Sequence, residues 1–452
     1  MQKYDVIVCG GGTAGMIAAV AAARSGARTL VVERDGCLGG TATYGIPFLG
    51  FFSGDGTKVV GGLPQEIVDR MVALGGSVGH VRGGSWLTAE GKHDYEFSLT
   101  PYDPESLKIA AQEMALESGV EVMFQSVLIG ARVDGKRVSA VELMTVEGRK
   151  EVRAEVFVDA TGDAMLAWMA GCPTELRGRG RMQNVTNLIR VGNVDAERLV
   201  DSLMSGGAVK GLKDWHIRLV RGKLVDGTEG LIHLAGHAQI WKDRPPLTFT
   251  GVRWRKHEMS LNITRTTDID PTQAQDVSRA EISERRNIEA VVRGLREQIP
   301  GFEKAYLVSS AVRVGIREGR RIRAAYTLTE EEVLNCQEFP DGIARGAYPI
   351  DIHDPRGGRT LFAFIRDGGS YAVPYRCLVP QKMENLLVAG RCVSTTGKAL
   401  GSVRLMACCM ALGQAAGTAA ALAARQGAVP ARLETAQLRK ELLEAGAILT
   451  VS

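Results

Sequence analysis

Three glycines near the N-terminus constrain the fold more than any other feature of the sequence. Gly10, Gly12 and Gly15 stand directly after the apolar run 5–9 and at the start of an Ala-rich stretch, 16–26. In this spacing the first glycine permits a tight turn, the second lets the backbone approach a pyrophosphate, and the third lets a helix pack closely on a strand. The unpaired N–H groups at the start of that helix would face the phosphates. The pattern predicts a β-turn-α unit that binds a dinucleotide.

The stretch after this helix ends in an acidic residue at a matching distance. Residues 27–33 form a second buried apolar run, and their last residue, Glu33, stands 18 residues after Gly15. A carboxylate at this place can accept hydrogen bonds from the ribose hydroxyls of a bound dinucleotide. The fingerprint does not separate NAD from FAD. Further expected contacts at this turn are Thr13, Ala14 and Arg34.

Turn signals divide the rest of the N-terminal part into short elements. Asp103 and Pro104 open a helix that ends at Gly119, and the apolar run 119–124 is typical of a strand. Between residues 125 and 158, two hairpin turns separate further strands, which predicts a three-stranded β-meander. Together these elements predict an α/β fold with a Rossmann-like dinucleotide-binding domain.

The middle of the chain has a different texture. Residues 246–255 and 258–266 are expected to be strands of a second sheet, and near residue 380 the buried-strand pattern returns, followed by a helix of small residues. We therefore expect a discontinuous dinucleotide-binding domain, 1–165 and 375–452. A mixed α+β substrate domain, 166–374, would be inserted between its two parts.

A long helix is expected inside this middle segment. Ser278 and Glu281 have the spacing of a capping box, which predicts a helix start at this point, and Pro300 with Gly301 would end the helix. The residues expected to point inward are Ile282, Ile288, Val292, Leu295 and Ile299.

Charge and cysteine content exclude several classes of protein. The 452 residues carry 55 basic and 51 acidic side chains, so a dedicated nucleic-acid binder is not expected. None of the eight cysteines forms a C-x-x-C pair, which argues against a zinc ribbon, and Cys408 and Cys409 are expected in the core. The start of the chain leaves no room for a signal peptide, so we expect a cytoplasmic protein. Residues 406–424 are mostly Ala and Gly around Gln414, which favours a buried helix over a membrane span.

Several longer segments carry a family resemblance. Residues 33–43, 156–163 and 385–422 resemble the successive signatures of FAD-dependent oxidoreductases related to the fumarate reductase and succinate dehydrogenase flavoproteins. Segments 300–333 and 347–355 resemble the middle region of the same family. The resemblance covers nearly the whole chain. It implies FAD as the cofactor and a glutathione reductase-type FAD-binding fold, and it does not identify a substrate.

The FAD contacts expected from this reading come from separate parts of the chain. Two glycines would let the backbone run beside the cofactor, turns after buried strands would face it, and the resemblance places the adenine near Val127. Covalent relatives carry a histidine where this chain has Thr41, so we expect non-covalent FAD. No second glycine fingerprint follows a strand, so a separate NAD(P)H domain is not expected. The expected contacts are Gly39, Gly40, Thr41, Ala42, Thr43, Val127, Ala160, Thr161, Gly162, Asp163, Gly390, Arg391, Gly401, Ser402 and Val403.

His353 and Arg317 are candidates for substrate chemistry. His353 lies between Asp351 and Asp354, whose carboxylates would orient it and raise its pKa toward that of a proton-transfer group; the alternative is an ordinary loop histidine. Arg317 belongs to a run of five arginines between 313 and 323. The run is either an ion-paired surface or a source of one or two arginines that bind an anionic substrate.

One more arginine and two residue pairs are further candidates. Arg265 would point inward with Leu261 and Ile263 in a strand and would need a partner there. Tyr371 and Arg376 would flank the approach to the last FAD segment, or serve only for packing. His233 and His237 imitate part of a zinc motif without its glutamate, so no metal site is expected.

These observations leave three functional hypotheses open. The first is an FAD-dependent oxidoreductase that oxidises or reduces a small organic substrate by hydride transfer to or from flavin N5, with His353, Arg265, Arg317 and Tyr371 as catalytic candidates. The second is a flavin monooxygenase. The third is a non-catalytic flavin-binding subunit.

Overall fold

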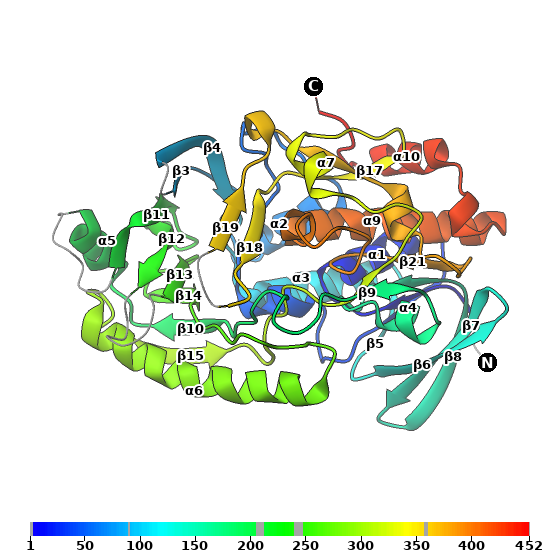
Figure 1. Ribbon diagram of the computed structural model, residues 1–452, viewed down its shortest axis with the longest axis horizontal. Coiled ribbons are helices and arrows are strands. Elements are labelled where there is room, and N and C mark those ends of the chain that lie inside the picture. Colours follow the sequence, from blue (N-terminus) through cyan, green and yellow to red (C-terminus); the bar gives the residue numbers. More distant parts are fainter. Residues whose placement is uncertain (1–2, 89–90, 205–211, 239–246, 357–359, 452) are drawn as a thin grey trace.

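A central sheet with a parallel core carries the first part of the fold. The computed structural model describes residues 3–88, 91–204, 212–238, 247–356 and 360–451 (Figure 1). Seven strands form this sheet in the order β5-β2-β1-β8-β7-β6, with β21 also paired to β8. The predicted β-turn-α-β unit and the three-stranded meander are both present. The strands are β1 Lys3–Cys9, β2 Thr29–Val32, β5 Glu121–Met123, β6 Val127–Asp134, β7 Arg137–Thr145, β8 Gly148–Asp159 and β21 Leu386–Val388.

Strand β8 joins the two kinds of pairing. Its first residues pair antiparallel with β7, and its later residues run parallel to both β1 and β21. Because of this arrangement, β21 from the last segment of the chain joins the sheet that the first segment forms, as the returning strand pattern near residue 380 predicts.

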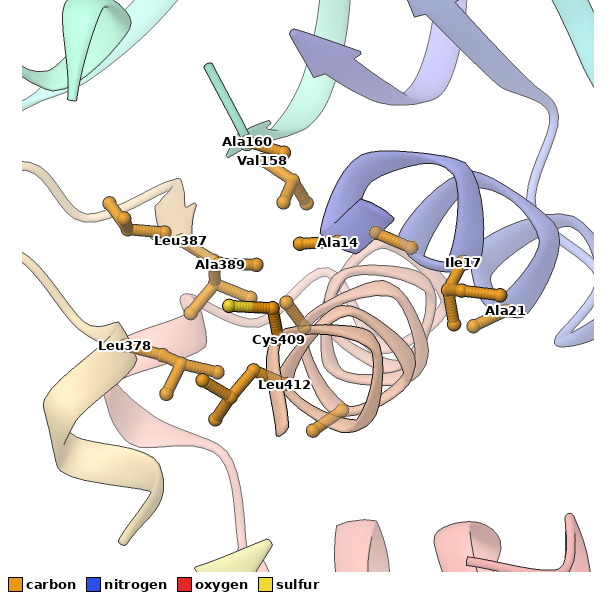
Figure 2. Packing of buried hydrophobic residues seen from close by; sticks show 14 of the residues in the cluster. Ala14, Ile17, Ala21, Val158, Ala160, Leu378, Leu387, Ala389, Cys409 and Leu412 are labelled. Carbon is orange, nitrogen blue, oxygen red and sulfur yellow. The ribbon is translucent and has the colours of Figure 1, made fainter. Parts of the chain in front are cut away.

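Two helices of small residues pack against each other at very close range. They are α1, Thr13–Arg24, and α9, Met406–Gln426. A Cβ added to Gly413 would lie 2.2 Å from the main-chain oxygen of Ala14, so the two backbones approach as closely as glycine allows. Figure 2 shows Cys409 and Leu412 of α9 packed near Leu378, Leu387 and Ala389. Among the described residues, α9 alone has the length and apolar character of a membrane-spanning helix, and 89% of that stretch is buried inside the fold.

A second sheet lies beside the first; its strands follow the order β11-β12-β13-β14-β10-β15, and all of these pairings are antiparallel. The long helix α6, Ala274–Gln298, packs on it and forms a second core with Ile189, Val191 and Leu261. Figure 1 shows α6 running along this sheet. The strands are β10 Ile189–Gly192, β11 Leu212–Lys223, β12 Glu229–Ala238, β13 Leu247–Val252, β14 Glu258–Asn262 and β15 Tyr306–Ser310.

The start predicted for this helix is wrong by one turn. The helix begins at Ala274, so Ser278 is inside it and donates its hydroxyl to the main-chain oxygen of Ala274 at 2.8 Å. The predicted inward position of Ile282 is also wrong, since this side chain is 54% exposed. A serine-to-glutamate spacing also occurs within helices, and here no capping box is formed. The predicted end before Pro300 is confirmed, and Ile288, Val292, Leu295 and Ile299 are buried.

The described packing distributes the middle segment over both cores. Ile322, Ile343 and Tyr371 belong to the core of the first sheet, although their segment is part of the expected inserted domain. Conversely, Phe97 from the N-terminal part belongs to an aromatic cluster with Trp254, which follows strand β13 of the second sheet. The remaining strands are β3 Val81–Thr88, β4 Gly91–Leu99, β9 Thr174–Glu175, β16 Arg321–Ile322, β17 Gly342–Gly346, β18 Ile350–His353, β19 Thr360–Ala363 and β20 Tyr371–Pro374. The remaining helices are α2 Leu63–Ala73, α3 Pro104–Glu117, α4 Met165–Met169, α5 Ala196–Met204, α7 Glu330–Leu334, α8 Leu400–Val403 and α10 Thr435–Glu444.

Candidate functional site

One large cavity lies between the two sheets. It has a volume of about 890 Å³. The carboxyl ends of β1, β2, β8 and β21 contribute one side of its lining, and residues of the second sheet and of the hairpin β18–β19 contribute the other. Ligands of open α/β sheets bind outside the carboxyl ends of the strands, so this cavity lies where a dinucleotide is expected.

The glycine loop borders this cavity as its spacing predicts. Gly10 has φ +96°, and a Cβ there would lie 2.6 Å from the main-chain oxygen of Ala160. A Cβ on Gly15 would collide with the main-chain oxygen of Gly10. Gly12 differs, because a Cβ there would meet nothing within 4 Å, and no side chain caps the first turn of α1. The first and third glycines are thus required by protein contacts, and the second borders open space suited to a pyrophosphate.

Glu33 is fixed at the wall of the same cavity. Its side chain is buried, with one carboxylate oxygen accepting from the Gly11 N–H at 2.6 Å and the other from the Asp35 N–H at 2.8 Å. Burial raises its pKa, and the hydrogen bond from Gly11 opposes that change. Arg34 also lines the cavity, as does Arg313, which forms an ion pair with Asp35.

The glycine pair 39–40 packs against the glycine loop. Gly39 forms a bridge with Gly12, and a Cβ on Gly40 would lie 2.8 Å from the Gly12 Cα. Gly40 and Thr41 line the cavity. The expected contacts Gly39, Ala42 and Thr43 are not part of its lining.

The turns after β8 and β21 meet across the cavity floor. Asp159, at the end of β8, is buried and accepts from the Thr161 N–H at 3.0 Å and the Thr161 hydroxyl at 2.7 Å, which fixes the turn. Asp163 then forms a 2.8 Å ion pair with Arg391. The expected contacts found in the lining here are Val127, Ala160, Thr161, Gly162, Asp163, Gly390 and Arg391.

The expected contacts at 401–403 lie behind the wall. Gly401, Ser402 and Val403 are buried, and the Ser402 hydroxyl bonds to the Tyr348 main-chain oxygen at 2.5 Å and to the Tyr371 hydroxyl at 2.7 Å. The lining at this point comes instead from Arg404, Leu405 and Met406. Helix α9 begins at Met406, so its N-terminal end does face the cavity. Tyr371 is therefore held away from the cavity lining by its contact with Ser402.

Three arginines surround His353 at one part of the cavity. We call Arg265, Arg317 and Arg404 the cationic cluster. Arg317 and Arg404 line the cavity, and Arg265 lies behind Asn262, a lining residue. The Asn262 amide oxygen accepts from Arg265 at 2.8 Å and from Arg317 at 3.5 Å. The candidates Arg265, Arg317 and His353 are thus brought together, although they are far apart in the sequence.

His353 is held by its own hairpin. Its Nε2 atom lies 3.4 Å from Asp351 Oδ1, and its Nδ1 atom lies 3.1 Å from the Thr360 hydroxyl. The pKa of His353 is lowered well below its usual value by burial, and then by the positive charges of the cationic cluster. The prediction of a raised pKa is therefore wrong, because burial and three arginine charges together outweigh Asp351. Asp354 does not help, since its carboxylate accepts from the Arg356 N–H.

Sequence reasoning missed Arg404. Its guanidinium donates to the Asp351 main-chain oxygen at 3.1 Å. The available signal is an arginine placed directly before a helix whose residues are almost all small and apolar. Burial of that helix would bring such an arginine against the core and toward a buried partner.

Two other arginines of the run 313–323 contact other side chains of the protein. Arg321 is buried in ion pairs with Glu175 and Glu318, and Arg320 lies over the Trp168 ring. The arginine run thus contains both ion-paired residues and one member of the cationic cluster.

The structure also shows the contacts of Arg376 and of His233 from the zinc-like pattern. Arg376 pairs with Asp341. His233 lies on strand β12 and stacks on Phe97 with ring centres 5.0 Å apart, while the side chain of His237 falls outside the described residues. Among described residues, no group of three His, Cys, Asp or Glu side chains is arranged for a metal ion.

Comparison with known proteins gives one family and several distant structural likenesses. A geranylgeranyl bacteriochlorophyll reductase-like protein from Thermoplasma acidophilum is 15% identical, with 99% of this chain and 85% of that chain covered and a TM-score of 0.47. A p-nitrophenol 4-monooxygenase from Pseudomonas putida is 12% identical, with 98% and 85% covered and a TM-score of 0.46. A myxobacterial chondrochloren halogenase is 13% identical, with 98% and 78% covered and a TM-score of 0.45.

The family result agrees with the geometry of the cavity. The glycine loop, the fixed Glu33 carboxylate and the open space beside Gly12 suit a dinucleotide that carries a pyrophosphate and a ribose. The model of the FAD-dependent oxidoreductases matches residues 5–442, which is nearly the whole chain. The protein is therefore an enzyme that uses FAD, and this chain belongs to the FAD-dependent oxidoreductase family.

Proposed function

We propose that this enzyme carries out a two-electron oxidation or reduction of a small organic carboxylate that binds at the cationic cluster. The observation that carries the proposal is an excess of buried positive charge. The charges that act on Arg317 include those of Arg265, Arg404, Asp351 and Glu284, so three arginines stand beside two carboxylates in this group. Glu284 already accepts from the Asn187 N–H at 2.8 Å and the Thr266 hydroxyl at 2.6 Å.

Unpaired donors support the same conclusion. Among the described atoms, Arg265 Nη2 and Arg404 Nε are buried and have no hydrogen-bond partner. A guanidinium stays protonated in proteins, and a buried charge without a partner is costly. A carboxylate in the cavity would supply the missing negative charge and could form paired hydrogen bonds with a guanidinium.

His353 is suited to move a proton in this site. Bound FAD supplies the acceptor or donor of the electron pair. The low pKa keeps the free imidazole neutral at pH 7, so it can accept a proton, and Asp351 with Thr360 fixes the ring orientation. A substrate carboxylate would offset the arginine charges and raise the pKa of His353 in the complex. The base would therefore become stronger when an anionic substrate is bound.

A ligand titration of the holoenzyme tests this proposal. Small carboxylates such as propanoate and hexanoate, added to the FAD-loaded protein, should perturb the flavin absorbance, and the matching neutral amides should not. Arg317→Gln and Arg404→Gln should each weaken carboxylate binding by at least about tenfold. Arg376→Gln, which removes the same charge from the surface pair with Asp341, is the matched control.

Two outcomes would contradict the proposal. One is binding of amides as tightly as carboxylates. The other is oxygen consumption driven by NAD(P)H with insertion of oxygen into the product, which would assign the monooxygenase alternative.

A further inference from the structure

The hairpin β18–β19 places an aromatic ring beside the charged groups. Its register pairs His353 with Thr360 and Asp351 with Phe362. Directly paired residues share one face of a hairpin, and residues two apart on a strand share it too. Asp351, His353, Thr360 and Phe362 therefore point to the same side, and all four line the cavity. On this face of the hairpin, the Asp351–Phe362 pair lies next to the His353–Thr360 pair, and Phe362 is its apolar residue.

Phe362 continues into a larger apolar wall. The aromatic cluster that contains Trp254 also includes Phe97 and Tyr348. Phe362, Leu49 and Leu405 pack against this cluster. The five residues other than Trp254 also line the cavity. The wall meets the cationic cluster at two points, because Leu405 follows Arg404 in the chain and Phe362 is paired with Asp351.

The described residues that form this wall carry no positive charge. The lining arginines outside the cationic cluster are at the glycine-loop end or at the turns after β8 and β21: Arg34 and Arg313 lie near Glu33, and Arg391 pairs with Asp163. Arg320 lies over the Trp168 ring of α4. A second carboxylate on a substrate bound at the cationic cluster would thus meet mostly aromatic and aliphatic side chains. The Tyr348 hydroxyl and the His233 ring, which stacks on Phe97, are polar groups at this wall, and two such groups would replace only part of the water that a carboxylate loses.

We propose that the substrate is a monocarboxylate with an apolar body, its carboxylate at the cationic cluster and its body on the wall formed by Leu49, Phe97, Tyr348, Phe362 and Leu405. This inference rests on the proposed function and narrows its substrate class. Dicarboxylates of similar length are poor ligands of this site, since one of their charges would face the apolar wall. Added methylene groups should each improve binding about fourfold, because each buries apolar surface.

The test compares carboxylates on the FAD-loaded enzyme by flavin difference spectra. Propanoate, hexanoate and 3-phenylpropanoate form the apolar series, and succinate and glutarate form the dicarboxylate series. We expect 3-phenylpropanoate to bind at least about tenfold more tightly than succinate. Phe362→Ala should weaken 3-phenylpropanoate by about tenfold and leave propanoate within about twofold. Leu361→Ala is the matched control, because the side chain lies on the opposite face of β19 and is 64% exposed.

The possible outcomes separate the two proposals. Succinate binding as tightly as 3-phenylpropanoate would overturn the apolar-body inference and leave carboxylate binding intact. An equal loss of propanoate and 3-phenylpropanoate in Phe362→Ala, at full flavin content and with an unchanged visible circular dichroism spectrum, would also overturn it. Failure of every carboxylate to bind the wild-type enzyme would remove the proposed function together with this inference.

Discussion

Asp351 and His353 share one face of strand β18, with 3.4 Å between Asp351 Oδ1 and His353 Nε2, yet the pKa of the histidine is lowered and not raised. Burial and three arginine charges together outweigh one adjacent carboxylate. This balance makes the protonation of His353 sensitive to any negative charge that enters the cavity.

The first prediction concerns the pH dependence of turnover with a carboxylate that reduces the flavin. If His353 is the base, activity is present above its pKa and is lost as the pH falls through it. In the free enzyme this pKa is lowered, whereas bound substrate offsets the arginine charges and raises it. The acidic limb of kcat should therefore lie at higher pH than the acidic limb of kcat/KM.

Arg317→Gln gives the internal check on this profile. It removes the charge that contributes most, after burial, to lowering the pKa of His353, so the acidic limb of kcat/KM should move to higher pH. Coincident limbs in the wild-type enzyme, or a shift to lower pH in the variant, would show that another group titrates.

The second prediction concerns the role of His353 itself. His353→Ala should keep its FAD and lower the rate of flavin reduction by about 10²–10⁴-fold, the usual loss when a general base is removed. Rapid-reaction absorbance measurements with a carboxylate substrate provide the rate. His257→Ala, at an exposed turn, serves as the control. An unchanged rate in His353→Ala would remove this residue from proton transfer.

The third prediction tests the open space beside Gly12. Gly12→Val should prevent retention of FAD, because the new side chain would enter space that no protein atom occupies within 4 Å of its Cβ. The ratio of flavin absorbance to protein absorbance after purification measures this loss. Gly36→Val is the matched control, since Gly36 is exposed, also has no neighbour within 4 Å and is not part of the cavity lining. Normal flavin content in Gly12→Val would show that the pyrophosphate binds elsewhere.

The fourth prediction concerns how FAD is held. Thr41 lines the cavity where covalent relatives would carry a histidine, and we expect non-covalent binding. Acid precipitation should then leave a colourless pellet and release FAD into the supernatant, which chromatography identifies. A yellow pellet would indicate a covalent bond, and released FMN would contradict the role of Glu33, because FMN lacks the adenosine ribose.

The fifth prediction concerns the ion pair between Asp163 and Arg391. Asp163→Asn leaves a mostly buried guanidinium without its charged partner and should lower the free energy of unfolding by about 1–3 kcal/mol. Urea unfolding of the FAD-loaded protein, followed by circular dichroism, measures the change. Glu147→Gln removes an exposed pair with Lys150 and should leave the urea midpoint where it is. Equal midpoints for all three proteins would show that the Asp163 pair does not stabilise the fold.

Local patterns predicted those parts of the protein whose determinants lie close together in the chain. The glycine loop, Glu33, the meander and the end of α6 depend on neighbouring residues, and the structure has all of them. The start of α6 was misplaced because the spacing of Ser278 and Glu281 is equally compatible with a position inside a helix.

The electrostatics of the site could not be predicted in the same way. The pKa of His353 depends on Arg265, Arg317 and Arg404, and nothing in the residues adjoining His353 indicates that these come together. The membership of Phe97 in the aromatic cluster is likewise set by tertiary packing, which period and spacing do not encode.

The close packing of α1 against α9 also sets an order of events during synthesis. Helix α1 ends at Arg24, but the glycines that let its partner approach, Gly413 and Gly417, are made almost 390 residues later. At about 5–20 residues per second, a ribosome needs roughly 20–80 s to cover that distance. The glycine loop thus leaves the ribosome well before the helix that packs against α1. The close contact between α1 and α9, at the helix that follows the glycine loop, therefore forms only after α9 has been translated.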